Sequence, residues 1–148
     1  MAEQGLAAVT GNFRQRRKDM VFFCTLAMVG CFLLWKCRIG IGNFDETFYL
    51  TIPYRLLRGD ALFREEWHLS QMSGVLLVPA VWLYTRLTGG TEGILLAMRL
   101  VCVAVMLASS AYLYLRLKRF DWLGASAAAL SFALYIPFSI NALSYNSM

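Results

Sequence analysis

The sequence predicts an all-α, polytopic membrane protein with three transmembrane helices and juxtamembrane helices in a long outer loop. Three observations predict this class. Of the 148 residues, 59% are hydrophobic and only 16% are charged, and the mean hydropathy is +0.55. The hydrophobic fraction and the mean hydropathy exceed those of a soluble domain of this length, and the charged fraction is lower. The basic residues, which give a net charge of +5, cluster beside apolar runs. That clustering does not indicate binding to nucleic acid.

The first predicted span covers about residues 20–36 and follows a cytoplasmic tail, residues 1–19. A run of 16 non-ionisable residues starts at Met20 and is roughly 24 Å long as a helix, and the snorkelling side chain of Lys36 lengthens it. The stretch RQRRKD precedes this run and no small-residue cleavage site follows it, so we expect an uncleaved signal anchor. The four basic residues before the run predict a cytoplasmic N-terminus.

Two further spans are predicted at about 93–115 and 122–140. A shorter apolar run, MSGVLLVPAVWLYT at 72–85, has 14 residues and a central proline, which is more typical of a helix along the membrane surface. If 72–85 does not cross, seven lysines and arginines lie in the cytoplasm and six outside; if it crosses, five lie inside and eight outside. The positive-inside rule therefore predicts three crossings.

These spans leave one long outer loop, residues 37–92, which carries most of the polar chemistry. Three helices are expected in this loop: 44–58, bent at Pro53 and stopped by Gly59; 62–70; and 72–86 along the interface. The third span reaches the outer face just as the sequence ends with NALSYNSM. We therefore expect residues 20–148 to be the opening part of a larger multi-pass protein that would be inactive as a fragment.

Five segments of the sequence, taken in order, resemble a known superfamily. In sequence order they are DETFY (45–49), WHLSQ (67–71), the apolar stretch 72–85, MRL (98–100) and RLKR (116–119). In this order and spacing the chain resembles the N-terminal portion of the GT-C superfamily of membrane glycosyltransferases. The protein O-mannosyltransferases and the lipid A aminoarabinose transferases are the members it resembles most.

The resemblance implies a plasma-membrane enzyme of the cell envelope that transfers a hexose or pentose on the outer face. The donor would be a polyprenyl-phosphate sugar, and the acceptor a lipid, a glycan or a protein. No cofactor is certain, and the resemblance leaves a divalent metal open, because Leu69 and Ser70 stand where the family's histidine motif often has prolines. The alternative is a non-catalytic multi-pass subunit or transporter component whose outer loop binds partners.

Two interpretations apply to Asp45 and Glu46, which start the first helix of the outer loop. Asn43 and Glu46 have the spacing of a capping box, and acidic residues in a first turn favour the helix dipole. Alternatively, a carboxylate about ten residues after a span can remove the proton of an acceptor hydroxyl at the membrane boundary. Capping explains Glu46 better than Asp45, so Asp45 is the predicted general base and Glu46 the second catalytic candidate.

Three further residues are predicted to bind the donor: Arg99, His68 and Gln71. Ionisable residues inside a span are functional candidates. Arg99 would either grip a lipid-linked phosphate, or snorkel to the outer interface, or pair with Glu92. His68, the only histidine, would bind the donor phosphate, the acceptor or a metal, although its spacing to neighbouring acids is no metal signature. Aromatic residues, Tyr114 and Trp122 among them, are expected to mark membrane interfaces.

Overall fold

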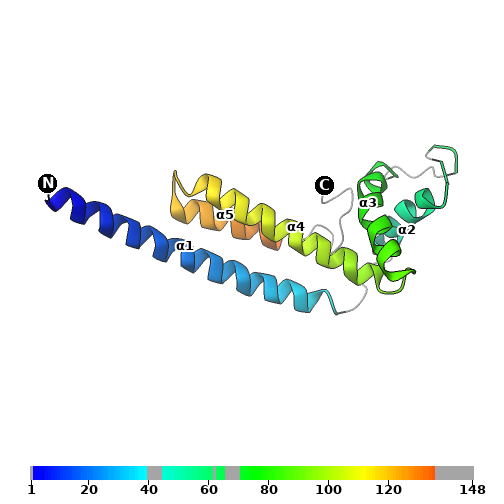
Figure 1. Ribbon diagram of the computed structural model, residues 1–148, viewed down its shortest axis with the longest axis horizontal. Coiled ribbons are helices and arrows are strands. Elements are labelled where there is room, and N and C mark those ends of the chain that lie inside the picture. The colour runs from blue at the N-terminus through cyan, green and yellow to red at the C-terminus, as the bar shows by residue number, and fades with distance from the viewer. Residues whose placement is uncertain (1, 40–44, 62, 66–70, 136–148) are drawn as a thin grey trace. The chain divides into compact units, whose positions relative to one another are not determined.

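The computed structural model describes residues 2–39, 45–61, 63–65 and 71–135. All regular secondary structure in these ranges is α-helical, as predicted (Figure 1). The helices are α1 (Ala2–Lys36), α2 (Asp45–Leu57), α3 (Gln71–Thr88), α4 (Ile94–Leu117) and α5 (Trp122–Leu134). The chain divides into two compact units. One combines the part of α1 up to Leu33 with the residues from Met106 to Leu134, and the other contains the residues from Leu34 to Val105.

Two helices of the described chain are long and apolar enough to cross a membrane: the Phe13–Lys36 part of α1, and α4. They match the first two predicted spans, although α1 begins at Ala2 and so continues through the predicted tail. The predicted third span is longer than the helix in the structure, because α5 has 13 residues and Tyr135 lies outside the helix. A helix of that length is roughly 20 Å long, less than the hydrocarbon core of a bilayer. Residues 136–140 lie outside the described ranges.

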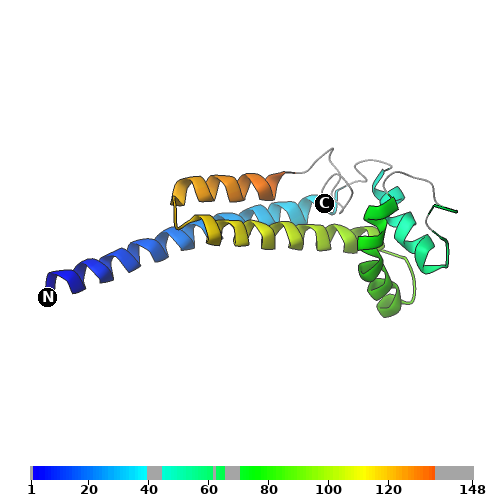
Figure 2. The same cartoon turned by 90° about the horizontal axis from the view of Figure 1, so that it is seen from above.

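The first unit is a three-helix bundle in which α1 and α4 run antiparallel (Figures 1 and 2). The ring of Phe22 stacks on that of Tyr114 with centroids 3.7 Å apart. Further along α1, a Cβ atom on Gly30 would lie 3.1 Å from the Leu107 side chain. From the first contact to the second, the residue number rises on α1, from 22 to 30, and falls on α4, from 114 to 107. The two helices are therefore antiparallel.

Small residues let α5 approach its neighbours closely. Its buried positions are Ala125, Ala129 and Ala133, which recur every four residues and therefore lie on one face. The hydroxyl of Ser110 on α4 donates a hydrogen bond to the Ala129 carbonyl over 2.6 Å. Asp121 begins the helix as an N-cap, since its carboxylate accepts hydrogen bonds from two backbone N–H groups of the first turn.

A polar cluster closes one end of this bundle. The Asp19 carboxylate accepts hydrogen bonds from the Tyr114 hydroxyl at 2.7 Å and from Lys118 Nζ at 2.6 Å. Tyr114 is fully buried inside the bundle, and Trp122 is half-buried and packs against the same core. That these aromatic residues mark membrane interfaces stays a prediction.

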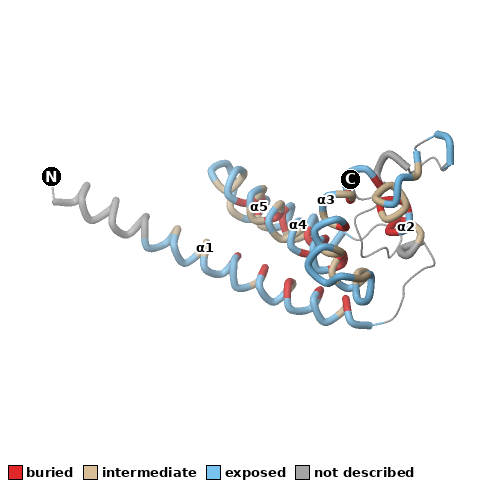
Figure 3. Tube along the Cα trace, turned by 45° about the vertical axis from the view of Figure 1, so that its right-hand side comes forward, coloured by how far each residue is buried: buried red, intermediate tan, exposed pale blue. Residues whose placement is uncertain are grey.

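Buried positions on α1 fall on one side of the helix, as Figure 3 shows. In the first unit they are Phe22, Leu26, Gly30 and Leu33, with spacings of three and four residues. Between Met20 and Trp35 the other sides of the helix expose large apolar side chains, among them Phe23, Met28 and Phe32. An apolar surface of this extent suits contact with lipid or with another apolar partner.

The second unit is built on the packing of α2 against α3. A Cβ atom on Gly74 would lie only 2.5 Å from Cγ2 of Ile52, so the helices meet where α3 has no side chain. Leu50, Val81 and Met98 form its core and join α2, α3 and the start of α4. The predicted helix 44–58 is confirmed closely, and it continues through Pro53.

Glycines stop both α2 and α3. Gly59 follows α2 with φ of 105°, and Gly89 follows α3 with φ of 71°. Glycine adopts this left-handed conformation without strain, which is why it commonly ends a helix. Of the predicted helix 62–70, residues 63–65 form a turn, and residues 62 and 66–70 lie outside the described ranges.

Candidate functional site

Asp45 and Glu46 are the first two residues of α2. The backbone therefore places both carboxyl-bearing residues in the first turn, where negative charge interacts favourably with the helix dipole. Asn43 and the side chains of Asp45 and Glu46 lie outside the described part of the chain. The choice between capping and proton transfer thus stays a prediction for both residues.

Arg99 holds two separate stretches of backbone together. Its side chain is buried, with 4% of its surface exposed, and Nη1 donates a hydrogen bond of 2.8 Å to the carbonyl of Cys37. Cys37 directly follows α1, whose last carbonyls have no partner within their own helix. Arg99 therefore does not snorkel to the surface of its unit.

The predicted pairing of Arg99 with Glu92 is not seen either. The backbone carbonyl of Glu92 accepts a hydrogen bond from the Tyr84 hydroxyl, and no ion pair joins its side chain to Arg99 in the described structure. Pairing with Glu92 was one of three interpretations of Arg99 and is wrong. Binding of a phosphate by Arg99 stays a prediction.

The side chains of the other two predicted donor-binding residues are not described. His68 lies outside the described ranges. Gln71 is the first residue of α3, and its side chain is likewise not described. Of Asp45, His68, Gln71 and Arg99, only Arg99 therefore has a described side chain. In these same ranges no group of three or more His, Cys, Asp or Glu side chains could hold a metal ion.

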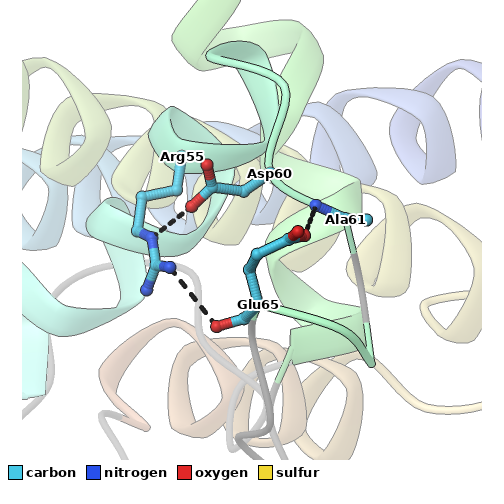
Figure 4. Close-up of polar contacts among 4 residues, drawn as sticks. All are labelled: Arg55, Asp60, Ala61 and Glu65. Atoms are coloured by element: carbon cyan, nitrogen blue, oxygen red, sulfur yellow. Dashed lines mark hydrogen bonds and ion pairs between the residues drawn. The ribbon is translucent and has the colours of Figure 1, made fainter.

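The turn after α2 uses its acidic residues for local structure (Figure 4). Arg55 Nε lies 2.6 Å from an Asp60 carboxylate oxygen, and Arg55 Nη2 donates to the Glu65 carbonyl at 3.3 Å. The Glu65 carboxylate accepts a hydrogen bond from the Ala61 N–H at 2.6 Å. Asp60 therefore bonds to Arg55 within this turn. Since both partners of the ion pair are partly exposed, the pair orders the turn more than it stabilises the fold.

A cleft of about 540 Å³ opens between the end of α2 and the end of α3. We call it the arginine cleft; it is lined by Tyr54, Leu57, Arg58, Trp82, Thr85, Arg86 and residues 89–91. Arg58 donates two hydrogen bonds to the Tyr54 hydroxyl, at 2.9 and 3.2 Å. Arg86 lies over the Trp82 ring, 6.0 Å from its centroid.

The arginine cleft is suited to an anion. Throughout the described ranges, neither Arg58 nor Arg86 forms an ion pair with a carboxylate. Guanidinium groups bind phosphate and carboxylate through two parallel hydrogen bonds, and aromatic faces orient them. Sequence analysis missed this cleft, although Tyr54–Arg58 and Trp82–Arg86 both have the i, i+4 spacing of neighbours on a helix face.

The arginine cleft and the predicted general base lie at opposite ends of α2. Asp45 begins the helix and Leu57 ends it, so about 18 Å of helix separates them. A ligand held by Arg58 would therefore not place its reacting atoms beside Asp45. Comparison with protein-family models, curated proteins and solved structures finds no match to this chain.

Proposed function

We propose that this chain belongs to a polytopic membrane glycosyltransferase of the GT-C type. It moves a sugar from a polyprenyl-phosphate donor to an acceptor on the outer face, and Asp45 is the general base. The resemblance of the DETFY, WHLSQ, MRL and RLKR segments to that superfamily supports the reaction class. The chemistry of a carboxylate close to a membrane boundary supports the role of Asp45.

The antiparallel packing of α1 and α4 is the observation that carries the proposal. The bond between Lys118 and Asp19 places the end of α4 beside the part of α1 that directly precedes its apolar run. Two neighbouring antiparallel spans have their connecting segment on one side of a membrane. Residues 37–92 would then lie on a single face, as the positive-inside rule predicts for a cytoplasmic N-terminus.

The proposed reaction needs one proton acceptor at that face. The acceptor hydroxyl oxygen forms a bond to the anomeric carbon of the sugar while the bond from this carbon to the phosphate oxygen breaks. The hydroxyl proton passes to the Asp45 carboxylate, and polyprenyl phosphate leaves with the electron pair. Because the donor's phosphate is fixed at the headgroup level by its lipid, the base has to lie at the same level. Asp45, nine residues after Lys36, is suitably placed in the sequence.

Replacement of each of the two carboxylates by its amide tests this proposal. The product of the complete reading frame is reconstituted in liposomes with polyprenyl-phosphate hexoses and pentoses, and released polyprenyl phosphate is measured. Asp45→Asn removes the proton acceptor while keeping size and capping ability, so turnover should fall by about 10²–10⁴-fold. Glu46→Gln keeps the reach of a capping box, so its effect should be clearly smaller.

Two results would contradict the proposal. Wild-type protein that releases no polyprenyl phosphate above protein-free liposomes would exclude the reaction. Near-normal turnover of Asp45→Asn, with turnover lost in Glu46→Gln, would mean that the wrong carboxylate is assigned. The unfolding midpoint of both variants is the control, because a loss of stability would lower turnover by itself.

The arginine cleft favours a second candidate function: a non-catalytic membrane subunit whose 37–92 segment binds an anionic partner. Arg58 follows the end of α2 opposite to Asp45 and Arg86 lies on α3, so the cleft can hold an anion away from the start of α2. Arg58→Gln with Arg86→Gln separates the two candidates. In a binding subunit this double variant loses the anionic partner and Asp45→Asn changes nothing. In a transferase Asp45→Asn abolishes turnover even when the cleft is intact.

A further inference from the structure

A second groove lies in the first unit, between α1 and the start of α5. We call it the basic groove; it has a volume of about 520 Å³ and is lined by Phe13, Arg14, Arg17, Lys18, Val21 and Trp122. Half of these side chains are cationic and half are apolar or aromatic. The proposed catalytic chemistry does not use this groove.

The three cations of the basic groove are not neutralised by the protein. The nearest carboxylate along the chain, Asp19, is already bonded to Lys118 and Tyr114. In the described parts of the chain no ion pair reaches Arg14, Arg17 or Lys18. The groove therefore combines three unpaired positive charges with an apolar surface, which suits an anionic ligand that also has an apolar part.

The aromatic wall of the basic groove orients one of these charges. Lys18 Nζ lies 5.3 Å from the centroid of the Trp122 ring, within the range of a cation–π interaction. Trp122 itself is held in place because it packs against the core of the bundle. A tryptophan fixed beside basic side chains is a common arrangement at the boundary between a bilayer and water.

The basic groove also lies where the surface of α1 changes from polar to apolar. Arg14 and Arg17 are exposed on one side of this boundary, and Met20, Val21 and Phe23 are exposed on the other. A phospholipid seated here would place its headgroup on the arginines and the start of its acyl chains along the apolar side chains. A soluble anion would leave the apolar half of the groove unused.

We infer that the basic groove binds the headgroup of an anionic phospholipid in the leaflet that faces the N-terminal side of α1. Arg14 and Arg17 would contact the phosphate, and Trp122 and Val21 the glycerol and upper acyl chain. Basic pockets between spans on the cytoplasmic side are known to hold such headgroups. This lipid site is independent of the proposed glycosyl transfer and needs only that this end of the bundle lies at a membrane surface.

A pair of charge-matched variants tests the inference. Arg14→Gln/Arg17→Gln removes two charges from the basic groove, and Arg116→Gln/Arg119→Gln removes two exposed charges at the same end of the bundle but outside it. The whole chain is purified in neutral detergent micelles, where the orientation of insertion plays no part. Native mass spectrometry then counts bound phosphatidylglycerol and phosphatidylcholine.

Wild type should retain phosphatidylglycerol in preference to phosphatidylcholine. A basic residue near an anionic surface contributes about five-fold in affinity, so Arg14→Gln/Arg17→Gln should lose about thirty-fold and the control pair much less. Equal losses in the two variants would show a general charge effect and overturn the inference, as would equal retention of the two lipids by wild type. Displacement of the lipid by equimolar free glycerol phosphate would also overturn it, because the site would then recognise a soluble anion. Unchanged helix content by circular dichroism is the check on folding.

Discussion

Arg99 is a buried cation near the start of α4, and its guanidinium donates to the carbonyl of Cys37, the residue that follows α1. A side chain in this setting contributes to stability as well as to any binding role. Removal of a charged donor leaves the Cys37 carbonyl without this bond, and a hydrogen bond to a charged group contributes about 1.5–3 kcal/mol. The sequence pattern marked Arg99 as important, and the structure gives it a definite partner.

Replacement of Arg99 by leucine should therefore destabilise the protein even when no lipid donor is present. We expect a loss of about 2 kcal/mol in the free energy of unfolding, measured by denaturant titration in detergent. Arg99→Lys should recover part of it, because lysine keeps the charge but not the planar fork. Arg116→Leu, an exposed change on the same helix, is the matched control. If Arg99→Leu unfolds like this control, the bond to Cys37 carries little stability.

At the scale of the helix, local signals and long-range contacts differ in how well they can be predicted. Helix α2 ends one residue before the predicted boundary because Gly59 stops it, and α4 matches a long apolar run. These features depend on neighbouring residues only. The bond from Lys118 to Asp19 joins residues 99 apart in the sequence, and that from Arg99 to Cys37 joins residues 62 apart. No periodicity or spacing specifies such partners.

The candidate sites show the same difference between local features and long-range contacts. Asp45 was singled out by its place after a span, and its position at the start of α2 matches that expectation. The arginine cleft was missed because it needs the ends of α2 and α3 to lie side by side. The predicted third span, 122–140, was longer than the helix, because α5 ends at Leu134.

The contact between α2 and α3 predicts how a methyl group at Gly74 would act. A Cβ atom there would meet the stiff, buried Ile52 at 2.5 Å, so Gly74→Ala should destabilise the protein by about 1–3 kcal/mol despite the better helix propensity of alanine. Gly90→Ala is the control, because nothing lies within 4 Å of its Cβ position. Unfolding in detergent measures both variants.

A double-mutant cycle tests the contact between Gly74 and Ile52 directly. Ile52→Ala removes the methyl group that Gly74→Ala would meet, so the second substitution should cost less in this background than in wild type. Strictly additive changes in the free energy of unfolding would show that Gly74 and Ile52 do not restrict each other. The packing of α2 on α3 would then depend on other residues.

For the molecule as a whole, the number of crossings decides which chemistry the chain can perform. In the proposed topology α1 and α4 cross in opposite directions, α3 lies along one face, and residues 37–92 share the compartment of Asp45. A crossing by α3 would instead make α1 and α4 run in the same direction. The stacking of Phe22 on Tyr114, together with the approach of Gly30 to Leu107, argues against that arrangement.

Cysteine labelling in intact cells tests this topology most directly. In a background with the four native cysteines replaced, single cysteines are placed at Thr91 and Arg119, both of which are exposed. We predict that a membrane-impermeant maleimide added outside labels Thr91→Cys, and that it labels Arg119→Cys only after the membrane is permeabilised. Labelling of Arg119→Cys from outside, or of neither position before permeabilisation, would contradict the proposed arrangement and with it the placement of Asp45 on the outer face.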